Sequence, residues 1–332
     1  MDIKDKTDDL KTHLGREFRK IHQCPLHAAA FVLSLFFFFT PHLLDAYTDA
    51  GFSLPNDVRE VTIHYKTFKN LILLPVTIND TVNVNLILDT GSRNLLLFGK
   101  RFEKIFNIEP VRRIKFAGLG NGGPLSGKLA LDNKVSIHAL LGEKIPVVIV
   151  PRNSLFAGRP DVHGIIGYDI FIKFETTIDA SNQLITFRPA EEADLPYGYT
   201  KIPLRIEDCK PLIHSKVFFS NPEGTAFDLM LDTGSALGLL LRSADTKRFE
   251  SGTPGKILGR GLCGFVTGSI ARAEKLVIDT FEIKALIAGI SWSTIHSHGS
   301  IGMGVMKDYT IVLNYCKAYA GFMNHQKASK NK

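Results

Sequence analysis

The chain reads Val-Asn-Leu-Ile-Leu-Asp-Thr-Gly-Ser at residues 84–92 and Phe-Asp-Leu-Met-Leu-Asp-Thr-Gly-Ser at residues 227–235. In both places an apolar run typical of a strand leads into the tetrapeptide, and a leucine-rich segment follows it. The pattern predicts a strand, a tight turn carrying a carboxylate, and a second strand, with a glycine that permits conformations resisted by residues with a Cβ. A single copy is ordinary turn chemistry. Two copies indicate a common origin.

The two halves of the chain also match outside these turns, at nearly constant offsets, which indicates a duplication. Residues 70–76 fall on residues 211–217 at an offset of 141, and Asp89 falls on Asp232 at an offset of 143. Residues 164–187 fall on residues 299–322 at an offset of 135 without a gap. Four glycines of each half also coincide at an offset of 141, namely Gly118, Gly120, Gly123 and Gly127 with Gly259, Gly261, Gly264 and Gly268.

The length and composition allow two substantial hydrophobic cores, because the chain has 332 residues and is 45% apolar. A polar stretch between Pro189 and Pro196 lies where the first repeat ends and the second begins. We therefore predict an N-terminal lobe over residues 47–190, a linker over 191–200 and a C-terminal lobe over 201–325.

Residues 1–46 differ from the rest, with a charged start and an apolar block of 12 residues from Ala28 to Phe39. That length suits the core of a signal peptide and is short for a membrane span of about 20 residues. Leu44-Asp45-Ala46 offers a small residue at a cleavage point. The pattern predicts either a removed signal peptide, with a periplasmic or extracellular product, or an uncleaved anchor attaching the chain to a membrane. The third interpretation of this apolar block is a helix buried in the core.

Charge and cysteine content exclude some function classes. The net charge is +7, but the basic residues are scattered and no aromatic-interleaved basic stripe occurs, so we expect no nucleic-acid partner. No glycine-rich phosphate loop stands between a strand and a helix, so no cofactor is expected. Cys209, Cys263 and Cys316 lack metal-site spacing, and their pairing stays open. His296 and His298 could share a strand face but have no evident third ligand, so no metal is expected.

Short β-branched or leucine-rich segments bounded by Gly, Pro or Asn predict a mainly β fold. A short helix is expected over Tyr168–Phe174, with its counterpart at Lys307–Tyr309, and a hairpin around Asp179–Asn182. The expected strands are 61–65, 71–78, 82–88, 95–98, 135–137, 145–150, 176–178, 184–187 and 311–313.

If the repeats fold as two similar lobes related by an approximate twofold, the turns near that axis bring Asp89 and Asp232 together. Two carboxylates at hydrogen-bonding distance cannot both ionise cheaply, so the pair holds one proton over a broad pH range. The ionised member can draw a proton from a bound water while the protonated member polarises a carbonyl oxygen. That combination suits amide hydrolysis without a covalent intermediate.

The two turns, the duplication and the Ile165-Ile166-Gly167 segment together resemble the aspartic peptidases of the pepsin and retropepsin class, in a bilobal single-chain form. The resemblance implies two β-barrel lobes with an active-site cleft between them, a polypeptide substrate, and a monomeric catalytic unit with Asp89 and Asp232 as catalytic residues. It also implies supporting roles for the rest of each turn. Thr90 and Thr233 would tie the turns together, and Ser92 and Ser235 would hydrogen-bond the outer carboxylate oxygens; ordinary turn capping is the alternative for these hydroxyls. The turn glycines are Gly91 and Gly234.

The glycine-rich segments lie where this family places the hairpin flap that closes over substrate, and flexible glycines suit a lid. Neither segment contains the tyrosine that pepsin-like flaps usually present, so a retropepsin-like flap acting through backbone contacts is expected. A plain mobile hairpin, or a flap in one lobe and a vestige in the other, are the alternatives. The flap candidates are Gly118, Gly120, Gly123, Gly259, Gly261 and Gly264.

Two functions follow from these features. The first is an aspartic endopeptidase that hydrolyses peptide bonds with a water activated between the paired aspartates. The second is a catalytically silent peptide-binding or scaffolding protein that keeps the same fold. Retention of both aspartates favours the enzyme. The missing flap tyrosine and Ser300, which replaces one apolar residue in the second bracing segment, favour the scaffold weakly.

Overall fold

The computed structural model describes residues 50–106, 112–151, 155–156, 158–245, 255–292 and 298–324. The expected signal peptide or anchor, residues 1–46, lies outside the described residues. The described residues from 50 onward belong to one compact unit. In the described part of the chain, no helix has the length and apolar character needed to cross a membrane.

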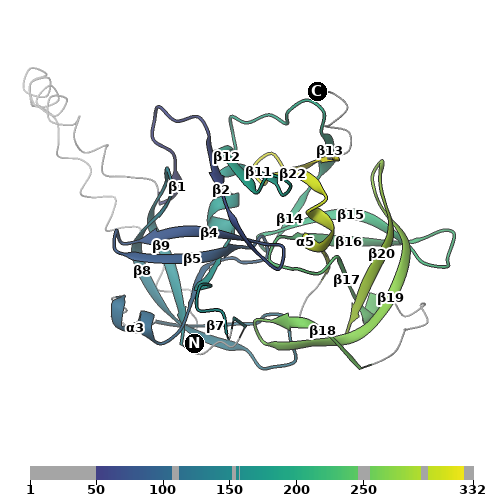
Figure 1. The fold of residues 1–332 in the computed structure, drawn as a ribbon, viewed down its shortest axis with the longest axis horizontal. Coiled ribbons are helices and arrows are strands. Elements are labelled where there is room, and N and C mark those ends of the chain that lie inside the picture. The colour runs from purple at the N-terminus through teal and green to yellow at the C-terminus, as the bar shows by residue number, and fades with distance from the viewer. Residues whose placement is uncertain are drawn as a thin grey trace, which may run out of the picture. The chain divides into compact units, whose positions relative to one another are not determined.

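The first half of the unit is a nine-stranded sheet in the order β1-β9-β6-β10-β5-β4-β8-β7, with β3 paired to β4 (Figure 1). An additional pairing between β8 and β9 closes the sheet into a barrel. The helix α3 (Arg101–Ile105) follows β6. The strands are β1 (Gly51–Ser53), β3 (Lys66–Phe68), β4 (Leu71–Ile78), β5 (Val82–Leu88), β6 (Leu95–Phe98), β7 (Arg112–Phe116), β8 (Leu125–Ile137), β9 (Leu140–Val150) and β10 (Gly164–Ile166).

The second half repeats this arrangement as an eight-stranded sheet in the order β14-β15-β16-β21-β17-β20-β19-β18, closed by a pairing between β15 and β19. The short helical turn η2 (Ser243–Asp245) follows β17. The strands are β14 (Arg205–Glu207), β15 (Lys210–Phe218), β16 (Thr225–Asp232), β17 (Leu239–Arg242), β18 (Lys256–Gly261), β19 (Gly264–Ile278), β20 (Phe281–Ser291) and β21 (Gly299–Gly302). The mainly β, two-barrel fold expected from the sequence is confirmed.

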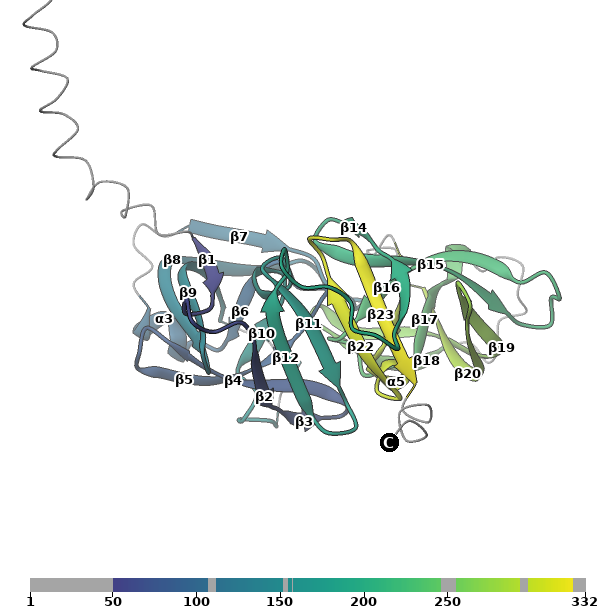
Figure 2. The same cartoon turned by 90° about the horizontal axis from the view of Figure 1, so that it is seen from above.

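A third sheet of six strands joins the two halves, in the order β13-β23-β22-β11-β12-β2 (Figure 2). Its central pair is β11 from the first repeat and β22 from the second, with Thr176 opposite Leu313 and Ile178 opposite Ile311. The two lobes therefore share a continuous hydrogen-bonded sheet. The strands are β2 (Val61–His64), β11 (Phe174–Asp179), β12 (Leu184–Pro189), β13 (Thr200–Pro203), β22 (Tyr309–Asn314) and β23 (Tyr319–Asn324).

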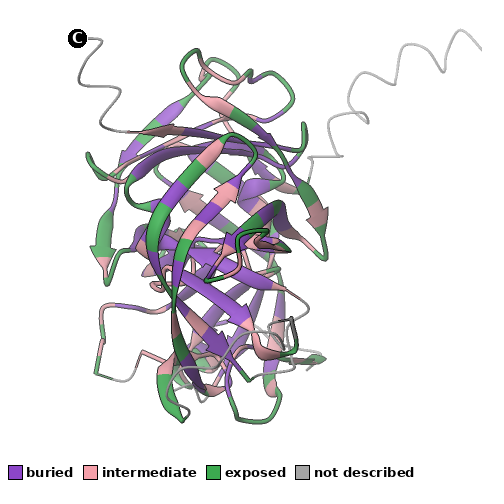
Figure 3. Cartoon of the chain, turned by 90° about the vertical axis from the view of Figure 1, so that its right-hand side faces the viewer, coloured by how far each residue is buried: buried purple, intermediate pink, exposed green. Residues whose placement is uncertain are grey.

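Burial alternates along the edge strand β2 of the shared sheet, whereas the central strand β22 is buried throughout; Figure 3 colours the chain by burial. In β2, Val61 and Ile63 are buried and their neighbours are exposed, as alternation predicts. All six residues of β22 are buried, so both faces of this strand are covered by packing.

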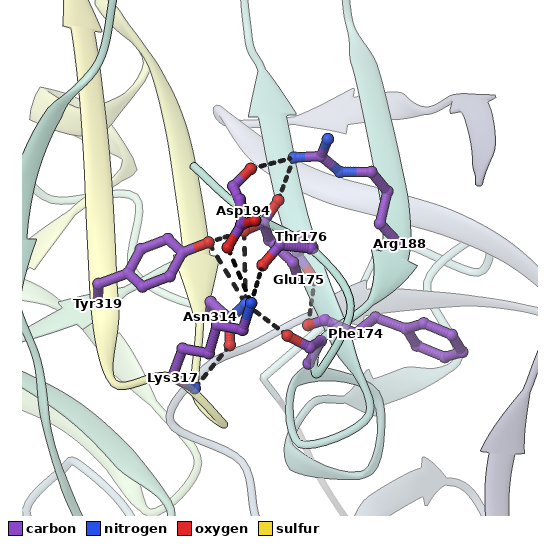
Figure 4. A network of polar contacts seen from close by, with 10 residues as sticks. Phe174, Glu175, Thr176, Arg188, Asp194, Asn314, Lys317 and Tyr319 are labelled. Atoms are coloured by element: carbon purple, nitrogen blue, oxygen red, sulfur yellow. Dashed lines mark hydrogen bonds and ion pairs between the residues drawn. The ribbon is translucent and has the colours of Figure 1, made fainter. Parts of the chain in front are cut away.

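A buried carboxylate anchors the shared sheet (Figure 4). The Glu175 side chain is fully buried and accepts hydrogen bonds from Arg188 of β12 and from the Tyr319 hydroxyl of β23. The amide of Asn314 in β22 donates to Glu175 at 3.4 Å and to the Ala190 carbonyl at 2.9 Å. One acidic group therefore connects strands of both repeats and the segment that leads from one repeat to the other.

The two expected helices differ from the prediction. The first is shorter than predicted, and the second lies earlier in the chain. The first, α4, spans only Tyr168–Phe171, because Phe174 already pairs with Pro189 in the shared sheet. Its counterpart α5 spans Met303–Met306 instead of 307–309, and Tyr309 begins β22. The observed pair keeps the offset of 135 residues.

Candidate active site

The two Asp-Thr-Gly-Ser turns are hydrogen-bonded to each other through their threonines. The backbone N–H of Thr90 donates to the Thr233 hydroxyl at 3.0 Å, and the N–H of Thr233 donates to the Thr90 hydroxyl at 3.0 Å. Each hydroxyl also donates across the lobe boundary, Thr90 to the Leu231 carbonyl at 2.6 Å and Thr233 to the Leu88 carbonyl at 2.9 Å. Both threonines are fully buried, so these bonds act without competition from water.

In each lobe, a residue just after a strand that pairs in parallel donates a hydrogen bond to the Asp-Thr-Gly-Ser turn of that lobe. In the first lobe, β10 pairs in parallel with β5, and the N–H of Tyr168 donates to the Ser92 carbonyl at 2.9 Å. In the second lobe, β21 pairs in parallel with β16, and the N–H of Met303 donates to the Ser235 carbonyl at 2.8 Å. The replacement of one apolar residue by Ser300 leaves this geometry intact.

The carboxylate of Asp89 lies against the turn that carries Asp232. Oδ1 of Asp89 accepts the N–H of Gly91 at 2.7 Å, and Oδ1 of Asp232 accepts the N–H of Gly234 at 3.0 Å. A Cβ on Gly234 would overlap the carboxylate of Asp89, so the acid of one turn lies directly against the backbone of the other. Only glycine fits this close approach.

Burial and mutual repulsion control the ionisation of this pair. Burial raises the pKa of Asp89 above its usual range, opposed by the Gly91 N–H and by Lys210. Burial raises the pKa of Asp232 further, and the negative charge of Asp89 adds to that rise. The pair therefore titrates as one unit and holds a single proton over an interval above the usual range of an aspartate.

The candidate flaps are two hairpins, one in each lobe. In the first lobe β7 and β8 pair from Arg112 to Leu129, and residues 117–124 form the tip, which contains Gly118, Gly120 and Gly123. In the second lobe β18 and β19 pair, with Gly259 and Gly261 on β18 and Gly264 at the start of β19. Both lobes therefore carry a hairpin at the position of the candidate flap.

The two hairpin tips bind each other mainly through their backbones. Cys263 donates its N–H to the Leu119 carbonyl at 2.9 Å and accepts the N–H of Gly122 at 2.5 Å. Asn121 donates its N–H to the Phe265 carbonyl at 3.0 Å and accepts the Phe265 N–H on its side-chain oxygen at 3.1 Å. The tips thus form a closed joint between the lobes.

Comparisons with known proteins agree with this geometry. Residues 74–170 match the family model described as aspartyl protease. Among solved structures, the chain is similar to the aspartic proteinase from Irpex lacteus, with a TM-score of 0.53 and 14% identity over 80% of this chain and 97% of that one. The chain has the bilobal fold of the pepsin- and retropepsin-like aspartic peptidases. A search of curated proteins finds no match.

The serines of this aspartic peptidase fold do not bind as the resemblance implies. The Ser92 hydroxyl donates to the Asn94 carbonyl at 2.8 Å, and the Ser235 hydroxyl accepts the Leu237 N–H at 3.3 Å. Both are local turn-capping bonds two residues along the chain, which a serine makes at little entropic cost. Gly91 and Gly234, rather than the serine hydroxyls, supply donors to the carboxylates.

Other residues near the site are not part of any recognisable sequence motif. Asp208 lies in the tight turn between β14 and β15, where it pairs with Arg93 from the first lobe and with Lys210. Lys210 is close enough to lower the pKa of both catalytic candidates. These side chains reach the site only through the packing of that turn, so spacing along the sequence does not mark them.

The remaining metal and cysteine candidates lie apart from this chemistry. Among the described residues, no group of three or more potential ligands could hold a metal ion. His298 contacts Glu207 at 3.1 Å, whereas His296 lies outside the described residues. Cys209, Cys263 and Cys316 are free thiols in the structure.

Substitution of Gly120 tests the flap joint. Gly120 has a φ of +130°, and a Cβ there would overlap the backbone of Cys263 and Gly264. Gly120→Ala should therefore open the joint and lower the hydrogen-exchange protection of residues 117–125 and 262–265 by about tenfold or more. Gly123→Ala is the matched control, because a Cβ at Gly123 meets no atom within 4 Å. Equal protection in the two variants would contradict the joint.

Proposed function

We propose that this chain is an aspartic endopeptidase in which Asp89 and Asp232 activate a water for attack on a peptide carbonyl. The observation that carries the proposal is the reciprocal threonine cross-link, which holds the carboxylate of Asp89 against the matching turn that carries the buried Asp232. The aspartyl protease family match over residues 74–170 supports the same chemistry.

The arrangement supplies both proton-transfer groups for the reaction. With one proton on the pair, the ionised carboxylate takes a proton from the water as its oxygen attacks the carbonyl carbon. The protonated carboxyl donates its proton to the carbonyl oxygen, so a neutral tetrahedral diol forms without a covalent bond to the protein. Return of protons through the pair to the leaving nitrogen releases the amine and the new carboxylic acid.

The paired flaps fit a polypeptide substrate. Both hairpins present backbone groups at their tips, and backbone donors and acceptors can bind an extended peptide whatever its side chains are. A closed joint between the lobes would also exclude bulk water while the bond is cleaved. We therefore propose that the joint opens to admit substrate and closes over it.

The purified chain should cleave members of a diverse peptide mixture between acidic and neutral pH, with new termini identified by mass spectrometry. A peptide inhibitor that replaces the scissile amide with a hydroxyl-bearing carbon should abolish cleavage, because it mimics the tetrahedral diol. Saturable binding of the inhibitor without any cleaved product would instead identify a catalytically silent peptide-binding protein.

A further inference from the structure

Tyr315 is held beside the first active-site turn by aromatic packing. It lies in the turn between β22 and β23 and is 4% exposed. Its ring stacks on Phe171, with ring centroids 5.4 Å apart and planes 15° apart, and its centroid lies 6.3 Å from that of Tyr168. Both partners belong to α4, whose first N–H binds the Ser92 carbonyl. The position of the Tyr315 ring is therefore tied to the first turn.

The hydroxyl of this tyrosine is buried and has no hydrogen-bond partner among the described residues. Tyr319, four residues along the chain, shows the usual arrangement, because its hydroxyl donates to Glu175. A buried hydroxyl without a partner is rare in native proteins, since the group loses its bonds to water and gains none. We therefore expect the Tyr315 hydroxyl to have a functional role.

The titratable groups around Tyr315 include both candidate catalytic aspartates. Burial raises the pKa of Tyr315 well above its ordinary value, and Asp89, Cys209, Asp232 and Tyr168 add to that rise. The phenol is consequently neutral and remains a proton donor at every physiological pH. The charged groups next to this set are Lys210, at the start of β15, and the partly buried Asp169 of α4, whose pKa burial raises to about 6.

The duplication does not repeat this phenol. At the offset of 135 residues that relates β11 and β22, the counterpart of Tyr315 in the first lobe is Ala180. The turn of the first lobe is capped instead by Asp179, whose Oδ1 accepts the N–H groups of Ser181 and Asn182 at 3.1 Å. The first lobe therefore has no phenol at the position equivalent to Tyr315.

We propose that Tyr315 is a positioning residue that donates a hydrogen bond, through one bridging water, to the singly ionised pair of Asp89 and Asp232. A buried water needs two to four polar partners, and the phenol and the two carboxylates provide them. The bond stabilises the negative charge of the pair without using a second charged group. This inference rests on the proposed peptidase function for its kinetic consequence but not for its effect on ionisation.

The test is Tyr315→Phe in the full chain, which removes the hydroxyl and keeps the ring. Losing a donor to the ionised pair should raise its first apparent pKa, so the acid limb of the kcat/KM profile should move up by about 0.5 to 1 pH unit. At the optimum, kcat should fall about five- to twentyfold, with KM within about twofold. An unchanged profile and kcat would overturn the proposal.

Two matched variants separate this effect from ordinary packing. Tyr319→Phe removes a buried hydroxyl that bonds Glu175, so it should lower stability and leave the acid limb in place. Asp169→Asn removes the partly buried carboxyl next to Tyr168 and should also leave the shift caused by Tyr315→Phe unaltered. A shift that disappears in the Asp169→Asn background would assign the effect to Asp169 and overturn the proposal.

A measurement without turnover distinguishes this inference from the proposed function. In Tyr315→Phe the Tm should fall more steeply between pH 4 and pH 7 than in the unaltered chain, because the ionised pair has lost a donor. If the chain cleaves no peptide but this difference is present, the peptidase proposal fails and the role of Tyr315 stands. If the two Tm profiles are parallel, the role of Tyr315 fails even when the chain is an active peptidase.

Discussion

Asp89→Asn and Asp232→Asn should each lower kcat for peptide cleavage by at least about 10³-fold, because the water then lacks a base or the carbonyl lacks an acid. The two losses should be similar in size, since the carboxylates share one proton and act as a unit. Activity is measured with a single fluorogenic peptide chosen from the cleaved mixture, and the fold is checked by circular dichroism. Retention of near-normal activity in either variant would show that no shared-proton pair operates here.

Asp228→Asn is the control for a change of charge near the site. Asp228 lies on β16 four residues before Asp232, forms an ion pair with Arg205 and contacts the His214 ring at 3.2 Å. Its side chain is partly exposed and it does not contact the other turn. This variant should cleave the same peptide within about twofold of the unaltered rate.

The same substitutions should stabilise the chain at neutral pH. The folded-state pKa values of Asp89 and Asp232 are raised, so the native state binds more protons than the unfolded state between the unfolded and the folded pKa. Stability is therefore fully present below the unfolded pKa and is lost as the pH rises through the folded pKa. Asp232→Asn should raise Tm at pH 7 and change it little at pH 4. A fall in Tm at pH 7 would contradict the repulsion between the two acids.

Glu175→Ala should lower the free energy of unfolding by about 3 to 5 kcal/mol, the largest stability loss we expect from one substitution. The change leaves Arg188 without its partner and removes the acceptor of the Tyr319 hydroxyl, while Asn314 loses one of its bonds (Figure 4). The loss is measured by urea denaturation monitored through circular dichroism. Because the sheet joins both repeats, unfolding of the two lobes should become less cooperative.

Two further variants provide losses of stability with which that of Glu175→Ala can be compared. Glu175→Gln keeps an acceptor for Tyr319 and removes only the charge, so its loss should be clearly smaller than that of Glu175→Ala. Asp194→Asn breaks an exposed ion pair with Lys317 on the same network and should change stability too little to measure. Equal losses for Glu175→Ala and Asp194→Asn would show that the buried network does not anchor the sheet.

The sequence predicts the parts of this fold that depend on local pattern. The bounds of β4, β5 and β6 agree with the prediction, because each is an apolar segment closed by turn residues. The placement of Asp89 and Asp232 followed from the repeat, which needed no knowledge of packing. The repeat also located the flap hairpins, although it did not show that their tips meet.

Other parts were missed because long-range pairing decides them. The prediction of strands over 135–137 and 145–150 captured only the ends of β8 and β9, whose remaining residues include glycine, lysine and asparagine with weak strand preference. Pairing between the two strands holds those residues extended, with register shifts near Asn133. Tyr315 and Lys210 come close to the carboxylates through turns that no pattern in the sequence relates to them.

The covalent link between the two repeats has a consequence for dilution. A site assembled from two separate subunits is lost when the protein concentration falls below their dissociation constant. In this chain the two halves are covalently linked, so the effective concentration of one half near the other is fixed. Activity per molecule should therefore be constant down to the lowest assayable concentration. The link also frees each half to change by itself, and one half now carries Tyr315 where the other carries Ala180.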